Sequence, residues 1–326
     1  KPETEVVHGR LLSAEEWKLL SEQVYPALLT GKTLSVQGSG KVGGSLLTSL
    51  MPYGVKLIAI ADAGGAIFGD DLDMGEVLAA VENSRNHPDK ALRASCVHAT
   101  KNVKERILGL SGSAKVLEIE CDIVAPAALE NAVTEENARK IKAKLEVCGA
   151  NGPNSSRAEQ ILAEQGVTVL YDFLANGAGV TASYFEWLRN LTDRFRYEAE
   201  QIRHVPFDIS CMDNYVMPEF KTRLKQILVN GESKHTTESW NLLLRDIMFA
   251  ALNEDYRFAK EHQVSMKTAG FLNAQLRVLA AILARMDEKD RQSMMARLPE
   301  KARTLLKPFM DHPEVRLFMQ RGNKNY

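Results

Sequence analysis

The chain has 326 residues, which is enough for two domains or for one domain with a large helical addition. Its 41 Lys and Arg nearly balance its 42 Asp and Glu, so no overall charge favours nucleic acid or an anionic membrane as a partner. The longest strictly apolar run, Val278 to Ala284, is too short to cross a bilayer, and we expect no membrane partner.

The four cysteines lie far apart and form no C-x-x-C pair, so buried, reduced thiols are the favoured interpretation. They are Cys96, Cys121, Cys148 and Cys211. Cys96 and His98 form the closest metal-capable pair, but two ligands do not define a zinc site, and we expect no metal. The chain starts at Lys1 with neither Met nor a signal peptide. We expect a cytoplasmic protein, with the mitochondrial matrix as the alternative.

A linker and a lead-in helix occupy residues 1–30. Ser13 and Glu16 form a capping-box pattern, which predicts a helix over residues 14–29. The Thr30-Gly31 pair ends it. This segment leads into a glycine-rich unit.

Three glycines follow a short apolar run at residues 34–36, which predicts a buried strand. Gly38, Gly40 and Gly43 have G-x-G-x-x-G spacing. The first glycine permits a tight turn, the second lets backbone approach a pyrophosphate, and the third allows close helix packing. The pattern therefore predicts a dinucleotide site. The residues between the glycines are further candidate contacts: Ser39, Lys41 and Val42.

A helix over residues 42–51 and a strand over residues 56–60 complete this unit. The helix N-terminus offers free N–H groups to phosphates. Asp62 closes the strand and can accept both hydroxyls of an adenine ribose, whereas it would repel a 2′-phosphate. No Lys or Arg occurs between Ala61 and Asp70 to neutralise such a phosphate. The predicted cofactor is therefore NAD rather than NADP.

Helical and strand patterns alternate through the rest of the first 190 residues. An acidic turn at residues 70–73 precedes a helix over residues 74–83, and residues 84–110 stay unassigned. Alternation of this kind predicts an α/β fold, a Rossmann-type doubly wound parallel sheet over residues 31–190. The further predicted strands are 116–119, 122–125, 144–147 and 167–170, and the predicted helices start at Thr134 and at Ser155 or Ser156.

Two loops at predicted strand ends each carry an asparagine, Asn151 and Asn176. A single such residue is most often a turn residue that tolerates a left-handed conformation. Two of them beside a dinucleotide site favour binding, because an amide side chain offers a donor and an acceptor to a nicotinamide carboxamide. We expect both to contact the cofactor.

A helical region follows from Val180 to the C-terminus, and we assign residues 191–326 to a helical part that packs on the first domain. The first helix spans residues 180–204, and its aromatic band is a core anchor in preference to a ligand cage. One apolar face recurs at Leu272, Leu276, Leu279 and Leu283. Residues 285–326 carry ten Lys or Arg and six Asp or Glu, a surplus of four positive charges. A solvated helix face explains this surplus; a docking surface for an acidic partner is the alternative.

Several runs resemble the cofactor-domain half of the Glu/Leu/Phe/Val dehydrogenases. The glycine run at residues 36–43 is similar to that family's V-Q-G-F-G-N-V-G, and residues 268–274 resemble its C-terminal helix. The resemblance extends from about residue 31 to residue 280. The most specific runs are 122–131, 149–153 and 180–187, the last containing Tyr-Phe-Glu-Trp after Ser183.

The resemblance implies the NAD-binding domain of a glutamate dehydrogenase, which converts glutamate to 2-oxoglutarate and ammonia by hydride transfer within a homo-oligomer. It further implies cofactor contacts at Ala127 and Ala128. Substrate contacts would fall at Val180 and Ser183, where a serine hydroxyl in a first helical turn suits an anion. The predicted substrate is therefore glutamate or 2-oxoglutarate.

The departures from the family pattern concern catalysis. The glycine-rich P-x-G-G-G-K lysine motif and the proton-transfer aspartate of the family's first domain are absent, so we expect this chain to be inactive without an N-terminal catalytic domain. Lys41 replaces an Asn, Cys148 stands where Glu is common, and Ala178 falls on a glycine position. At a positive φ that alanine would cost about 1 kcal/mol. The alternative function is a non-catalytic dinucleotide-binding or protein-interaction module.

Overall fold

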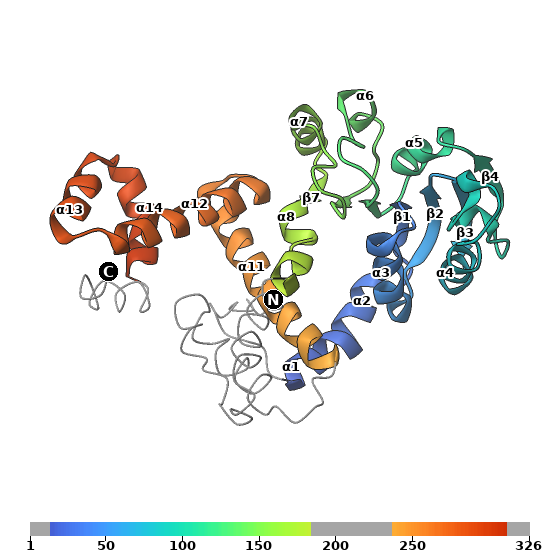
Figure 1. Cartoon of the computed structure of the whole chain (residues 1–326), viewed down its shortest axis with the longest axis horizontal. Helices are drawn as coiled ribbons and strands as arrows, with labels where there is room; N and C mark the ends of the chain where they lie inside the picture. The colour runs from blue at the N-terminus through green and yellow to red at the C-terminus, as the bar shows by residue number, and fades with distance from the viewer. Residues whose placement is uncertain (1–13, 184–236, 312–326) are drawn as a thin grey trace, which may run out of the picture. The chain divides into compact units, whose positions relative to one another are not determined.

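The computed structural model describes residues 14–183 and 237–311 (Figure 1). The chain divides into two compact units, Leu12–Val180 and Thr181–Tyr326, the second of which also takes in Lys1–Leu11. Within the described residues, no helix combines the length and the apolar character needed to cross a membrane.

The lead-in helix predicted over residues 14–29 is confirmed, although its middle is wider than an α-helix. It consists of α1 (Ala14–Leu19), a π-helical turn (Leu20–Val24) and α2 (Tyr25–Leu29). Pro26 has no N–H to give to the preceding turn, and the π-helical turn lies directly before it. Gly31, at φ +76°, ends the segment as expected. The predicted cap Ser13 lies outside the described residues.

A seven-stranded sheet forms the centre of the first unit, in the order β4-β3-β2-β1-β5-β6-β7. The five strands from β2 to β7 in this order pair in parallel, as predicted for a Rossmann-type fold. Four of the predicted strand positions beyond the first are confirmed within two residues. The strands are β1 Thr33–Gln37, β2 Lys56–Asp62, β3 Gly65–Leu72, β4 Glu105–Leu108, β5 Ile123–Pro126, β6 Leu145–Val147 and β7 Thr168–Leu170.

Two antiparallel strands at one end of the sheet were missed from the sequence. β3 returns along β2 after a tight turn, and β4 pairs with β3. Asp70 and Asp71 belong to β3, so the expected acidic turn is wrong. β4 forms the edge of the sheet and is largely exposed, and β3 becomes polar and exposed at Asp70 and Asp71. Neither strand therefore has the continuous apolar run of a buried parallel strand.

The strand predicted over residues 116–119 is wrong, because this segment belongs to helix α5 (Ser111–Glu118). Val116 and Leu117 are buried against the sheet, and the hydroxyl of Ser35 in β1 donates to the Val116 carbonyl. A short apolar run fits a strand and one buried face of a short helix equally well, so its period could not separate the two.

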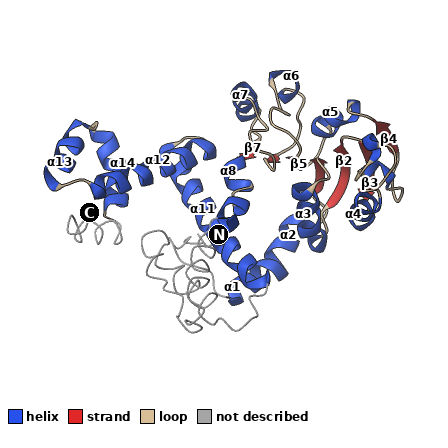
Figure 2. Cartoon of the chain, viewed as in Figure 1, coloured by secondary structure: helices blue, strands red, loops and turns tan. Residues whose placement is uncertain are grey.

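Helices cover both faces of the sheet (Figure 2). One apolar core lies under α5, α6 (Glu135–Ala138) and α7 (Ser156–Glu164). The other lies under α3 (Lys41–Leu50), α4 (Met74–Asn83) and the 3₁₀ turn Cys96–His98. The predicted caps are confirmed, with Thr134 in a capping box before α6 and Ser155 before α7.

The described part of the second unit is helical. Its elements are α11 (Thr237–His262), α12 (Met266–Arg285), α13 (Glu288–Arg297) and α14 (Glu300–Met310). The predicted apolar face of α12 is confirmed, since Leu276 and Leu283 are buried together with Leu306 of α14. Most of the helix predicted over residues 180–204, with its aromatic band, lies outside the described residues.

Candidate functional site

The glycine turn joins β1 to α3 through two very close backbone contacts. Gly38 has φ +114°, and a Cβ on it would lie 2.6 Å from the Ala127 carbonyl oxygen. A Cβ on Gly43 would lie 1.8 Å from the Gly38 carbonyl oxygen. Larger residues would therefore collide with backbone at both positions, which explains the first and third glycines of the motif.

The middle glycine faces open space instead. A Cβ on Gly40 would meet nothing within 4 Å, and Gly40 is the N-cap residue of α3. No side chain caps this helix end, so its first N–H groups face outward with the positive end of the helix dipole. The Lys41 side chain is exposed beside them. These features fit a diphosphate, which needs backbone donors and room for close approach.

Asp62 lies at the end of β2, where its carboxylate accepts four hydrogen bonds. Oδ1 accepts from the Gly64 amide at 2.9 Å and the Ser95 hydroxyl at 2.7 Å. Oδ2 accepts from the Ser39 hydroxyl and the Cys96 amide, both at 2.6 Å. A carboxylate has about four acceptor positions. A ribose hydroxyl would therefore have to replace one of these donors, and Ser39 is the donor that belongs to the glycine turn.

The ends of β5 and β6 lie against the same helix end. The Ala127 amide donates to the Gln37 carbonyl at 2.7 Å. A Cβ on Gly149 would lie 2.9 Å from Ala127 Cβ and 3.0 Å from Val42 Cγ1. The predicted contacts at Val42, Ala127 and Ala128 are thus brought together with the glycine turn.

The two asparagine loops also meet. Asn176 Nδ2 donates to Asn151 Oδ1 at 2.6 Å and to the Gly149 carbonyl at 3.5 Å. The Gly152 amide donates to Asp172 Oδ2 at 2.8 Å, which joins the loops a second time. Asn176 follows α8 (Asp172–Ala175), and its amide is fixed by these contacts. The two amide groups lie at the same edge of the sheet as the glycine turn. We call this edge the strand-end edge; it comprises residues 38–43, Asp62, Ala127, Ala128, Asn151 and Asn176.

The predicted substrate contacts lie on a helical segment over residues 178–183. Val180 is 75% exposed, and Ser183 is exposed too. Val180 is the last residue of the first unit and Ser183 belongs to the second. Ala178 is helical and is not among the residues with positive φ, so the strain considered for an alanine at this glycine position does not arise.

A buried acid in β6 was not singled out from the sequence. Glu146 is fully buried, and Asn154 Nδ2 donates to its Oε2 at 2.9 Å. Burial raises the pKa of the Glu146 carboxyl to about 7. An acid inside a strand expected to be buried on both faces was the available signal, because such strands are otherwise almost continuously apolar.

Three of the cysteines lie in the described residues; all three are buried, and none of them forms a disulfide there. Burial raises the pKa of the Cys121 thiol to about 11. The pKa of the Cys96 thiol is raised further, first by burial and then by the negative charge of the neighbouring Asp62. The raised pKa values disfavour the reactive thiolate form of Cys96 and Cys121. Cys211 lies outside the described residues.

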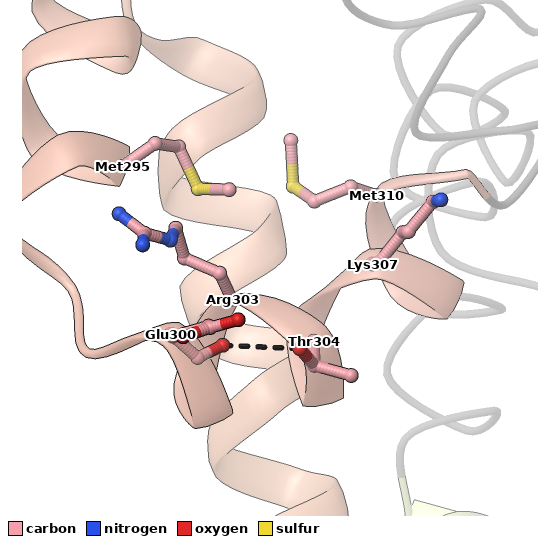
Figure 3. A pocket seen from close by; sticks show the side chains of 6 residues that line it. All are labelled: Met295, Glu300, Arg303, Thr304, Lys307 and Met310. Atoms are coloured by element: carbon pink, nitrogen blue, oxygen red, sulfur yellow. Dashed lines mark hydrogen bonds between the residues drawn. The ribbon is translucent and has the colours of Figure 1, made fainter.

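A hollow lies in the helical unit, between α13 and α14 (Figure 3). Arg303 and Lys307 are exposed there, and Thr304 Oγ1 donates to the Glu300 carbonyl at 3.1 Å within α14. These polar groups are solvated or locally paired. The strand-end edge is therefore the stronger candidate site. The hollow is lined by Met295, Glu300, Arg303, Thr304, Lys307 and Met310.

Comparison with known proteins gives consistent matches. The NAD-specific glutamate dehydrogenase A of Halobacterium salinarum is 37% identical over 172 residues, covering 53% of this chain and 36% of that protein. The NADP-specific glutamate dehydrogenase of Saccharolobus shibatae is 36% identical over 163 residues, covering 50% and 35% respectively. The chain therefore spans little more than a third of the length of these relatives.

A solved structure of glutamate dehydrogenase 2 from Plasmodium falciparum has the same fold. It matches 78% of this chain and 48% of its own, with a TM-score of 0.52 and 21% identity. The family model of the Glutamate/Leucine/Phenylalanine/Valine dehydrogenases matches residues 19–214, more than half of the chain. The chain belongs to this dehydrogenase family.

Proposed function

We propose that the strand-end edge binds a nicotinamide dinucleotide, as the cofactor domain of a glutamate-dehydrogenase-like oxidoreductase. The observation that carries this proposal is the uncapped N-terminus of α3, which opens onto free space at Gly40. Backbone donors without a side-chain cap provide an anion site that needs no further residues. The bound nicotinamide would supply hydride transfer.

Each part of the edge has a role in this proposal. The first-turn amides of α3 and the exposed Lys41 hold the diphosphate. Asp62 accepts the adenine ribose hydroxyls in place of the Ser39 hydroxyl. Asn151 and Asn176, already hydrogen-bonded to each other, orient the nicotinamide carboxamide. Ala127 and Ala128 form the floor on which the turn packs.

We propose NAD in preference to NADP. The Asp62 carboxylate would repel a 2′-phosphate, and the stretch from Ala61 to Asp70 offers no Lys or Arg to neutralise it. Relatives named for either cofactor match this chain, so the preference rests on these residues. Calorimetric titration with NADH and NADPH tests it. We expect tighter binding of NADH, and tighter binding of NADPH would overturn the assignment.

The proposed substrate is glutamate, or 2-oxoglutarate in the reverse direction, with Ser183 as a donor to the distal carboxylate and Val180 against the methylenes. A lost charge-assisted hydrogen bond costs about 1.5–3 kcal/mol. Ser183→Ala should therefore weaken 2-oxoglutarate binding in the presence of NADH about tenfold or more. NADH affinity is the internal control and should not change. Unchanged 2-oxoglutarate binding would contradict this role.

We further propose that the 326 residues alone do not turn over glutamate. Proton transfer from the substrate amine needs a base within hydrogen-bond reach, and the family's lysine motif does not occur in this sequence. Purified chain with glutamate and NAD should produce no NADH above background. Robust turnover would reveal a replacement base. NADH binding without any 2-oxoglutarate binding would favour the second candidate, a non-catalytic dinucleotide-binding module.

A further inference from the structure

Two buried polar atoms below the candidate site have no hydrogen-bond partner. They are Glu146 Oε1 and Asn154 Oδ1. Their residues are already joined, because Asn154 Nδ2 donates to the other carboxyl oxygen, Glu146 Oε2, at 2.9 Å. Glu146 is 0% exposed and Asn154 is 8% exposed, so both side chains are shielded from bulk solvent. A buried unpaired acceptor is costly, and here both partners of one contact carry such an acceptor.

The surroundings of Glu146 disfavour a negative charge. Its neighbours across the sheet are Val124 of β5 and Val169 of β7. The helix above, α7, contributes Glu159, whose charge opposes ionisation. The Cys148 sulfur lies 3.8 Å from Asn154 Nδ2 and is a weak, uncharged partner. Among the described residues, no Lys or Arg forms an ion pair with Glu146; the nearby Lys144 pairs with Asp122 instead.

We propose that Glu146 is a positioning residue that keeps its proton in the folded protein and donates it to Asn154 Oδ1, and that its ionisation loosens the loop carrying Asn151. A proton on Glu146 Oε1 turns this unpaired acceptor into a donor, and the donor pairs with Asn154 Oδ1. The acid and the amide then share two reciprocal hydrogen bonds. Burial of the carboxyl raises its pKa to about 7, which supports a protonated state below neutral pH.

The loop between β6 and α7 transmits this change to the candidate site. The Asn131 amide donates to the Gly152 carbonyl at 2.8 Å, and Asn154 forms a bridge with Val133. Asn151 lies between the Gly149 turn and these contacts. An ionised Glu146 leaves Asn154 Oδ1 unpaired and draws the carboxylate toward water, which weakens the attachment of the loop. The effect on cofactor affinity rests on the function proposed above, whereas the acid–amide pair does not.

The protonation state can be measured on the full chain. Carbon NMR of the glutamate carboxyl groups, with Glu146→Gln to assign the signal, gives the titration midpoint. We expect a midpoint near neutral pH. A midpoint near the ordinary glutamate pKa of 4.5 would overturn the proposal.

Glutamine at position 146 reproduces the neutral pair, because its amide can donate to Asn154 Oδ1 and accept from Asn154 Nδ2. We therefore expect wild-type NADH affinity to fall about fivefold between pH 6 and pH 8.5, beyond any change seen in Glu146→Gln. Amide hydrogen exchange of residues 149–155 should accelerate over the same range only in the wild type. Glu164→Gln removes an exposed acid from α7 and should behave as the wild type.

The outcomes separate the two proposals. Equal pH dependence in the wild type and Glu146→Gln, in both NADH affinity and loop exchange, would overturn the positioning role. If neither protein binds NADH at any pH, the proposed function fails, and the NMR midpoint with loop exchange still decides the acid–amide pair.

Discussion

Asp62 and Glu146 are two acids of the same sheet whose surroundings differ in the number of donors. Asp62 lies at the end of β2 and accepts four hydrogen bonds, two of them from backbone amides. Glu146 lies within β6 and accepts one, from Asn154. Amides beyond a strand end are free to turn toward a carboxylate, whereas those inside a sheet are used in the ladder. Asp62, at a strand end, therefore holds the glycine turn through its hydrogen bond with Ser39. Glu146, inside a strand, retains its proton.

The same chemical change at the two acids should alter stability by very different amounts, and this is the largest difference we expect. Asp62→Asn replaces one acceptor oxygen by a donor that faces other donors, so two hydrogen bonds to a charged group are lost. The expected destabilisation is about 3 kcal/mol or more. Glu146→Gln keeps both contacts of its pair and should cost less than about 0.5 kcal/mol at pH 6. Urea unfolding of both variants measures this.

Equal destabilisation by the two substitutions would contradict the comparison, since it would show that Glu146 also acts as a charged acceptor. Asp71→Asn serves as a control for the loss of a surface acid, because Asp71 is exposed on β3. Its stability should stay within about 0.5 kcal/mol of the wild type.

The pH dependence of stability sharpens the comparison further. Between the ordinary glutamate pKa of 4.5 and about 7, the unfolded chain has lost the Glu146 proton while the folded protein keeps it. Stability is therefore greatest below this window and falls as pH rises through it. The expected loss is about 3 kcal/mol, from a pKa rise to about 7.

Urea unfolding at pH 5 and pH 8 measures this loss, and Glu146→Gln provides the matched control. The variant should lack the part of the pH dependence of stability that comes from Glu146. It should therefore be more stable than the wild type at pH 8. If stability falls between pH 5 and pH 8 by the same amount in the variant as in the wild type, the pH dependence comes from other groups.

The hydrogen bond from Ser39 to Asp62 allows a test with a smaller expected effect, on NADH affinity. Its hydroxyl occupies an acceptor position that a ribose hydroxyl would need. Ser39→Ala should free that position and strengthen NADH binding about fivefold. Ser45→Ala, on the exposed face of α3, should leave the affinity unchanged. Weaker binding by Ser39→Ala would instead show that the Ser39 hydroxyl serves the cofactor directly.

Sequence reasoning succeeded where a backbone constraint selects the residue type. Gly38 and Gly43 are required by close backbone approach, and α4 begins where predicted because the Asp73 side chain caps its N-terminus. It failed where a short segment fits two structures, as at α5, and where a strand at or next to the sheet edge is partly polar, as at β4 and β3. These segments are decided by tertiary packing, which a local pattern does not contain.

The contacts of the candidate site also divide into those that the sequence could predict and those that it could not. The meeting of Asn151 with Asn176 was predictable, because parallel strands place their carboxyl ends at one edge. The four donors around Asp62 were not, since Ser95 and Cys96 lie in a stretch without a periodic pattern. Asn154 as partner of Glu146 was equally hidden, because a loop side chain folded into the core leaves no local signal.

The central claim is that a dinucleotide diphosphate lies against the N-terminus of α3, and NADH titration of Gly40→Asp tests it most directly. Aspartate is a favoured N-cap residue and has room at this position, so the variant should keep or gain thermal stability. Its carboxylate would occupy the anion site and repel the diphosphate, so NADH affinity should fall at least about tenfold. NADH binding as tight as that of the wild type would contradict the account.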